Sequence, residues 1–169
     1  SKSGVGKITI SGNNSYSGAT SFDTNCPIQI GSDTAFGSSA VSLNTSGYTL
    51  EAVGNDRVLQ SGFKFAASGG FIGSKALTLS GTNSTSGAAR SITNNSTATL
   101  TLGNLGLSTS TSEYRMSFYG TGSNVITGWV SNSTVTGNAF GVLRMYSDAQ
   151  IDPVTLATNG YPGNLTILG

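Results

Sequence analysis

The chain has 169 residues, of which Gly, Ser, Thr and Asn together make up 87, while charged residues account for only 9% and the formal net charge is +1. The eight Lys and Arg form no basic cluster, which argues against nucleic-acid binding by phosphate neutralisation. Because His is absent and carboxylates are scarce, we expect no enzyme activity, no metal site and no cofactor. No apolar run approaches the roughly 20 residues of a membrane span, so we expect no membrane insertion in this segment.

The chain is a series of short segments in which apolar and polar residues alternate, a pattern typical of half-buried strands. Gly, Asn or Ser bounds each segment within a few residues. In chain order, the predicted strands are 8–10, 28–30, 41–43, 63–65, 77–79, 100–102, 116–118, 154–156 and 165–167. Ala, Leu, Glu and Lys are too sparse for long amphipathic helices, so the predicted class is all-β.

An internal repeat favours a solenoid over other all-β folds. Segments 8–19 and 77–88 match without a gap at an offset of 69 residues, and a third copy opens at Leu165, 88 residues beyond the second. The copies therefore start near residues 6, 75 and 163 of a single domain spanning 1–169. Divided by three and four, these offsets give 23 and 22 residues, about one coil of a right-handed parallel β-helix. We predict such a β-helix with about seven coils.

In this fold, apolar side chains form inward columns, and Gly or Asn at the corners tolerates positive φ. Asn side chains are expected to hydrogen-bond their own kind in the coils above and below. The single Cys26 has no partner for an intramolecular disulfide, so we expect it to pack as a small core residue. Stability would then come from the stacking of neighbouring coils.

Residues 6–20, G-K-I-T-I-S-G-N-N-S-Y-S-G-A-T, resemble the autotransporter-associated β-strand repeat (the passenger-associated transport repeat), which is roughly G-x-L-T-L-S-G-x-N-T-Y-x-G-x-T. Residues 35–43 resemble its later element, with Phe36 where the family favours Leu, and the second copy carries Thr85 in place of the family's aromatic residue. The resemblance implies a β-helical passenger segment carried to the bacterial surface by type V secretion. It implies no catalytic residues.

Two groups of residues invite a catalytic interpretation. Ser74 and Lys75 are adjacent but have no further base in the sequence around them, so we do not expect a nucleophile there. Arg144, Asp148 and Asp152 are the nearest equivalent of the acidic and basic clusters of β-helix polysaccharide lyases. Since Asp152 precedes a proline, we interpret it as part of a solvated turn.

Two glycine-containing segments imitate ligand loops. Segment 69–73 lacks the Asp of calcium-binding solenoid repeats, and segment 4–7 lacks the strand and spacing of a phosphate loop, so neither predicts a site. Aromatic side chains could stack on sugar rings if exposed, although filling or capping a coil is their commoner use: Tyr114, Tyr119, Trp129, Tyr146 and Tyr161. Segments 114–119 and 142–146 are therefore the expected places for a specialised surface.

N-glycosylation sequons occur seven times, slightly above the chance expectation for this composition: Asn13, Asn44, Asn83, Asn94, Asn95, Asn132 and Asn164. They would indicate a glycosylated surface only in a eukaryote or an archaeon.

The predicted function is a non-enzymatic, extracellular structural or adhesive β-solenoid module at a bacterial surface. Its expected partners are further copies joined end to end, or the continuation of a longer chain, together with a host or surface glycan or protein ligand. One alternative is a β-sandwich fibre subunit, pilus-like, in which a terminal strand such as 165–169 completes a neighbour's sheet. The other is a polysaccharide-active β-helix enzyme, which would depend on Asp148 and Asp152.

Overall fold

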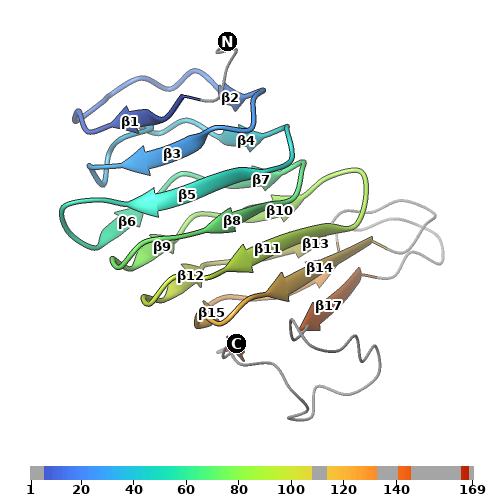
Figure 1. Cartoon of the computed structure of the whole chain (residues 1–169). Coiled ribbons are helices and arrows are strands. Elements are labelled where there is room, and N and C mark those ends of the chain that lie inside the picture. Colours follow the sequence, from blue (N-terminus) through green and yellow to red (C-terminus); the bar gives the residue numbers. More distant parts are fainter. Residues whose placement is uncertain (1–5, 108–113, 133–140, 146–164, 168–169) are drawn as a thin grey trace.

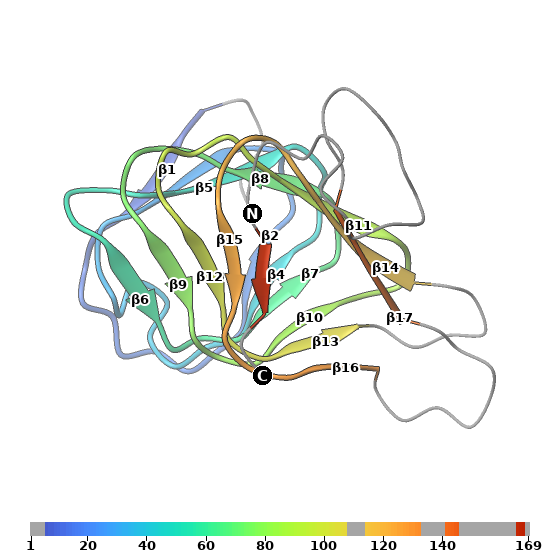
Figure 2. The same cartoon turned by 90° about the horizontal axis from the view of Figure 1, so that it is seen from below.

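The computed structural model describes residues 6–107, 114–132, 141–145 and 165–167, and this part of the chain forms three parallel β-sheets without a helix (Figure 1). The sheets contain seven, six and five strands and enclose one elongated core. Seen along the stack, the chain passes from the first sheet to the third, then to the second, and returns to the first (Figure 2). The predicted parallel β-solenoid is confirmed.

The strands of each sheet come from successive coils. The first sheet contains β1 (Ile8–Ile10), β3 (Pro27–Ile30), β5 (Tyr48–Ala52), β8 (Gly69–Phe71), β11 (Arg90–Asn94), β14 (Tyr114–Tyr119) and β17 (Gly141–Met145). The second contains β2 (Thr20–Phe22), β4 (Val41–Leu43), β7 (Phe63–Phe65), β10 (Asn83–Thr85), β13 (Leu105–Leu107) and β16 (Val130–Asn132). The third contains β6 (Arg57–Leu59), β9 (Leu77–Leu79), β12 (Leu100–Leu102), β15 (Asn124–Ile126) and β18 (Leu165–Ile167).

The path of the chain is right-handed. In Figure 1 the strands of the first sheet lie in front and point left, and the chain returns to the right behind them as the coils descend from the N-terminus. Every strand pairing among the described residues is parallel, as between β1 and β3 or β4 and β7. A β-sandwich fibre subunit would contain antiparallel neighbours, so that alternative fold is wrong.

The coil length agrees with the predicted 22 or 23 residues. Ile8 pairs with Ile28 and Ile28 with Leu50, which are spacings of 20 and 22 residues. The number of complete turns is about five, fewer than the seven predicted. The difference arises because the first two coils pass from the first to the second sheet through segments 11–19 and 31–40, which contain no strand of the third sheet.

The two similar sequence segments at an offset of 69 residues lie in different sheets. Residues 8–10 form β1 in the first sheet, whereas residues 77–79 form β9 in the third. A short strand followed by Ser and Gly therefore serves at more than one corner of the coil. What these segments share is the local sequence of a strand leading into a turn.

The core is a stack of alternating inward residues, as the period-two pattern predicts. Ile28, Leu50 and Phe71 occupy one column of the first sheet, since each is the register partner of the one before. Phe36, which comes from a loop, fills the core of the first coils, and Cys26 is fully buried as predicted. Together these residues make one continuous core along the described coils.

Two glycines permit close packing at corners between coils. Gly37 has a φ of +56°, and a Cβ at this position would collide with the backbone carbonyl of Tyr16. A Cβ on Gly103 would lie 2.5 Å from the carbonyl oxygen of Ser80 in the preceding coil. Both positions require glycine because another coil's backbone fills the space of the side chain.

Polar side chains connect the coils in two ways. On the outer face of the first sheet, Thr9 Oγ1 donates to Gln29 Oε1 (3.0 Å), and Gln29 Nε2 donates to Glu51 Oε2 (2.7 Å). The predicted asparagine ladder is reduced, within the described residues, to a single pair, Asn94 Nδ2 to Asn124 Oδ1 at 3.1 Å. The other buried Asn side chains bond to the backbone because corner amides and carbonyls have no sheet partner there.

Candidate functional site

A polar groove of about 520 Å³ lies at the corner where the first two coils lack a strand of the third sheet. It is formed by two loop segments from successive coils and by one arginine from the third coil. Its lining residues are Ser11, Asn13, Asn14, Ser15, Gly31, Ser32, Asp33, Thr34 and Arg57. We call it the corner groove.

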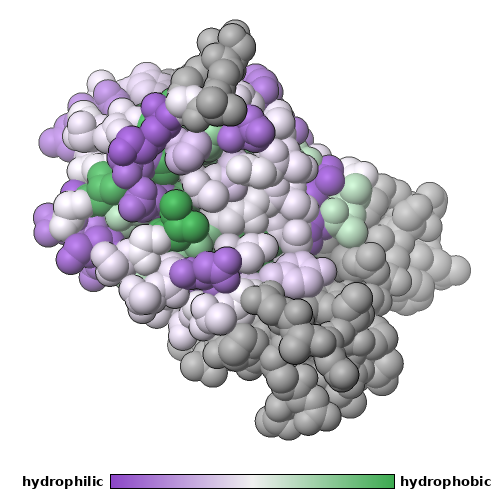
Figure 3. Space-filling view, in the orientation of Figure 1, coloured by the Kyte–Doolittle hydropathy of each residue, from purple (hydrophilic) through white to green (hydrophobic). Residues whose placement is uncertain are grey.

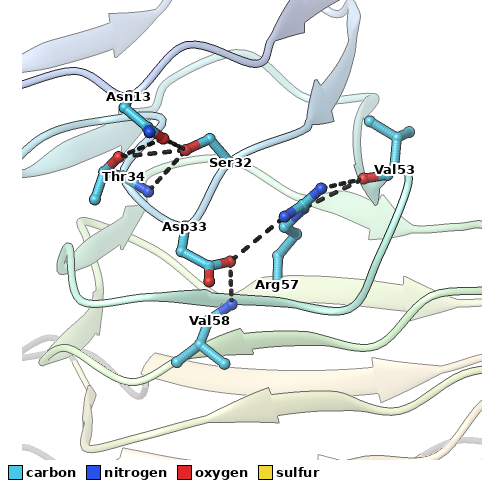
Figure 4. Close-up of polar contacts among 7 residues, drawn as sticks. All are labelled: Asn13, Ser32, Asp33, Thr34, Val53, Arg57 and Val58. Carbon is cyan, nitrogen blue, oxygen red and sulfur yellow. Dashed lines mark hydrogen bonds and ion pairs between the residues drawn. The ribbon is translucent and has the colours of Figure 1, made fainter.

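Asn13 is at the centre of a hydroxyl network in the corner groove (Figure 4). Its Oδ1 accepts hydrogen bonds from Ser32 Oγ at 2.6 Å and from Thr34 Oγ1 at 3.2 Å. Ser32 is buried, and its Oγ also accepts from the backbone N–H of Thr34 at 3.2 Å. These bonds assign the amide orientation of Asn13, because its oxygen must face the two donating hydroxyls.

Asp33 and Arg57 form the charged side of the corner groove (Figure 4). Asp33 Oδ1 accepts from the backbone N–H of Val58 at 3.1 Å and lies 3.9 Å from Arg57 Nη1. Arg57 donates from Nε and Nη2 to the carbonyl of Val53, at 3.2 and 2.9 Å. The side chain of Asp33 is 57% exposed, so the ion pair itself contributes little to stability.

The arginine of the groove belongs to a device that the sequence pattern does not reveal. Arg90, at the start of β11, donates from Nε and Nη2 to the carbonyl of Ser86 at 3.2 and 2.8 Å, just as Arg57 does to Val53. In both cases the acceptor is four residues earlier, where the chain turns into a strand. Each guanidinium therefore satisfies a corner carbonyl that has no ladder partner.

We expect Arg57→Ala and Arg90→Ala each to lower the free energy of unfolding by about 1.5–3 kcal/mol, because each removes charged donors from a partly buried carbonyl. Chemical denaturation followed by circular dichroism measures this. Lys64→Ala is the control, since Lys64 is an exposed cation on the outer face of β7. Equal stability of the arginine variants and the control would contradict the role assigned to the two arginines.

A second, shallower groove of about 380 Å³ crosses the outer face of the first sheet. Gly70 lies between its register partners Thr49 and Thr93, so the missing side chain leaves a notch in the outer column. Tyr48 lies beneath it, with its hydroxyl donating to the Ala67 carbonyl at 3.4 Å. Burial raises the pKa of Tyr48 well above its usual value, against the opposing positive charge of Arg90. No charged side chain lines this groove, so we assign the candidate site to the corner groove.

The structure does not bring together a catalytic centre from the residues that sequence analysis considered. Ser74 and Lys75 lie in the turn before β9, and Gly69–Phe71 form strand β8 rather than a calcium loop. Among the described residues, no three His, Cys, Asp or Glu side chains are close enough to hold a metal ion. The described part of the chain also contains no helix with the length and apolar character needed to cross a membrane.

Several sequence candidates lie outside the described residues: Gly4, Val5, Tyr146, Asp148, Asp152 and Tyr161. Tyr114 and Arg144 belong to strands β14 and β17. Trp129 precedes β16 with 48% of its surface exposed and donates its backbone N–H to Asn104 Oδ1 at 3.3 Å. The aromatic residues of the described part thus form no exposed row at the corner groove.

The sequons divide into exposed and buried ones. Asn13, Asn44 and Asn95 are exposed, whereas Asn83 and Asn94 are fully buried and hydrogen-bonded. A glycan cannot be accommodated on either buried side chain in the folded protein. Asn132 is part of β16, and Asn164 lies outside the described residues.

A scan of protein-family models, a search of curated proteins and a search of solved structures each found no match to this chain. The resemblance to the autotransporter-associated repeat therefore stays a prediction from the sequence.

Proposed function

We propose that this protein is a non-enzymatic structural module of an extracellular bacterial β-solenoid, which lengthens by stacking one coil edge on another. The observation that carries the proposal is the matching polarity of the two ends. The N-terminal end presents β1, β2 and β6, and the C-terminal end presents β17, β16 and β18, as the outermost described strands of the same three parallel sheets. A second copy placed head to tail would continue each sheet with the same strand direction.

The hydrogen bonds of the first coil support this proposal. The carbonyl of Ile10 accepts from Gly31 N–H, and that of Phe22 accepts from Asn44 N–H, each at 2.9 Å, so both point toward the second coil. Backbone groups of adjacent residues in a strand point to opposite sides. Those of Thr9 and Ser21 therefore point away from the stack, and β1 and β2 each have a single partner strand among the described residues.

The setting outside the cell rests on the resemblance to the passenger repeat and on the low cysteine content. A chain with one buried Cys needs no disulfide to hold its coils together, which suits passage through an outer-membrane pore. The shortage of charged and titratable side chains favours a scaffold over an enzyme. Antibody labelling of intact cells of the source organism tests this part, and labelling only after lysis would contradict it.

The stacking is tested with the double variant Thr9→Pro/Ser21→Pro. Proline removes the backbone N–H at both edge positions and leaves the bonds to the second coil in place. We expect the wild-type mass in light scattering to rise with concentration, and the variant to associate more weakly by about 1–3 kcal/mol, corresponding to two lost hydrogen bonds.

The matched control is Thr9→Val/Ser21→Val, which keeps both N–H groups and the strand propensity. Circular dichroism verifies that all three proteins retain the same fold. A wild-type protein that stays monomeric at every concentration, or a proline variant that associates as well as the valine control, would overturn the stacking proposal.

A further inference from the structure

We propose that the corner groove binds a neutral, polyhydroxylated ligand such as a hexose unit of a glycan. The groove lies on the side of the stack, so occupation of it does not depend on end-to-end assembly. Its volume of about 520 Å³ is within the range of small-molecule sites, about 300–1,000 Å³. Nearly all its side chains are hydroxyls and amides, the groups that recognise hydroxylated ligands.

The charges of the groove favour a neutral ligand. Arg57 directs Nε and Nη2 to the Val53 carbonyl and Nη1 toward Asp33, so its positive charge is already compensated. A phosphate, sulfate or carboxylate would have to compete with Asp33 for the guanidinium. A divalent cation would find one carboxylate, of which Oδ1 is already engaged by Val58 N–H.

The remaining hydrogen-bonding capacity suits hydroxyl groups. Asn13 Nδ2 and Asp33 Oδ2 have no hydrogen-bond partner within the described part of the chain, and they supply a donor and an acceptor on successive coils. A sugar hydroxyl can accept from the amide while a neighbouring hydroxyl donates to the carboxylate. The hydroxyls of Ser11 and Ser15 extend the same polar lining.

The groove is held in shape before any ligand arrives. Ser32 and Thr34 fix Asn13, and the Val58 N–H fixes Asp33, so binding orders few side chains (Figure 4). No aromatic ring lines the groove, so little apolar surface would be buried. We therefore expect weak, rapidly exchanging binding, with Kd on the order of 1 mM.

Nuclear magnetic resonance titration of the ¹⁵N-labelled protein tests the proposal. The probes are the methyl glycosides of glucose, galactose, mannose and N-acetylglucosamine, with glucuronate and inorganic sulfate as anionic competitors. We expect saturable amide shifts at residues 11–15 and 32–34 with at least one neutral glycoside. No saturable shift with any neutral glycoside, or stronger binding of glucuronate or sulfate, would overturn the proposal.

Two variants separate binding from folding. Asn13→Asp keeps the Oδ1 acceptor for Ser32 and Thr34 but removes the Nδ2 donor, and Asp33→Asn keeps an acceptor for Val58 N–H but removes the carboxylate. Each is expected to weaken binding by about tenfold or more. The control Asn25→Asp makes the same charge change at an exposed Asn outside the groove and should bind like the wild type.

Unchanged affinity in both groove variants would overturn the proposal even if the wild-type protein binds a glycoside. Loss of end-to-end association in the edge variants leaves this result untouched, because neither Thr9 nor Ser21 lines the groove. The two proposals therefore fail independently.

Discussion

Replacing Phe36 with Ala is expected to lower the free energy of unfolding by about 3–5 kcal/mol, the usual cost of removing a buried aromatic ring. Phe36 is completely buried, and its ring lies edge-on between Phe22 and Phe63, with centroid distances of 6.0 and 5.7 Å. It comes from segment 31–40, where the second coil lacks a strand of the third sheet, and it fills that side of the core. Without the ring, the first two coils lose the residue that joins them to the third.

Thermal and urea unfolding followed by circular dichroism measure this effect. For a domain of this size, the loss corresponds to a Tm lower by about 6–20 °C. Trp129→Ala is the control, because Trp129 is another large aromatic residue but is 48% exposed, and its loss is expected to cost less than about 1 kcal/mol. A Phe36→Ala variant as stable as this control would show that the aromatic contact does not join the coils.

Asn83→Ala is expected to destabilise the protein by about 3 kcal/mol or more, although it removes only a small polar group. Asn83 is fully buried; its Nδ2 donates to the carbonyls of Leu79 (2.9 Å) and Gly81 (3.0 Å), and its Oδ1 accepts from Phe63 N–H (3.2 Å). Truncation leaves these three backbone groups at the corner between β9 and β10 without their side-chain partner. Unpaired buried backbone groups are costly because water cannot replace the lost bonds.

The matched control is Asn95→Ala, which truncates an exposed Asn and should change stability by no more than about 0.5 kcal/mol. Denaturant unfolding of both variants gives the comparison, and the slope of each curve verifies that the same surface is exposed on unfolding. If the two Ala variants were equally stable, the corner bonds of Asn83 would be replaceable by other contacts.

The strands with apolar residues at alternate positions could be predicted from sequence. Segments 28–30, 41–43, 63–65, 77–79 and 100–102 are strands, because each buries two apolar side chains on one face. The strand predicted at 154–156 lies outside the described residues. The local pattern was therefore sufficient wherever hydrophobic burial alone selects the strand.

Other strands could not be recognised because neighbouring coils impose them. Strands β8 (Gly69–Phe71) and β10 (Asn83–Thr85) contain Gly, Asn, Ser and Thr and show no apolar alternation. Their extended backbone is fixed by ladders on both sides, β5 and β11 for the first and β7 and β13 for the second. Such strands depend on register between segments about 20 residues apart, which no local pattern contains.

The corner groove was missed for the same reason. Asn13, Asp33 and Arg57 come from three coils and meet only when the coil register is known. Their residue types give no signal in the sequence, since Asn and Ser occur throughout this chain. The residues that did attract attention, such as Ser74 and Lys75, are neighbours in sequence but have no arrangement around them that would support chemistry.

The parallel ladders between coils run along the length of the stack, and this has a mechanical consequence. A force applied along that direction loads the hydrogen bonds of one interface at a time, so the coils should peel off singly rather than rupture together. Each coil adds about 4.8 Å to the folded length but releases about 70 Å of chain when it opens, for roughly 22 residues. A surface rod of this kind is an extensible tether, in which each lost coil lengthens the connection more than tenfold while the remaining coils stay folded.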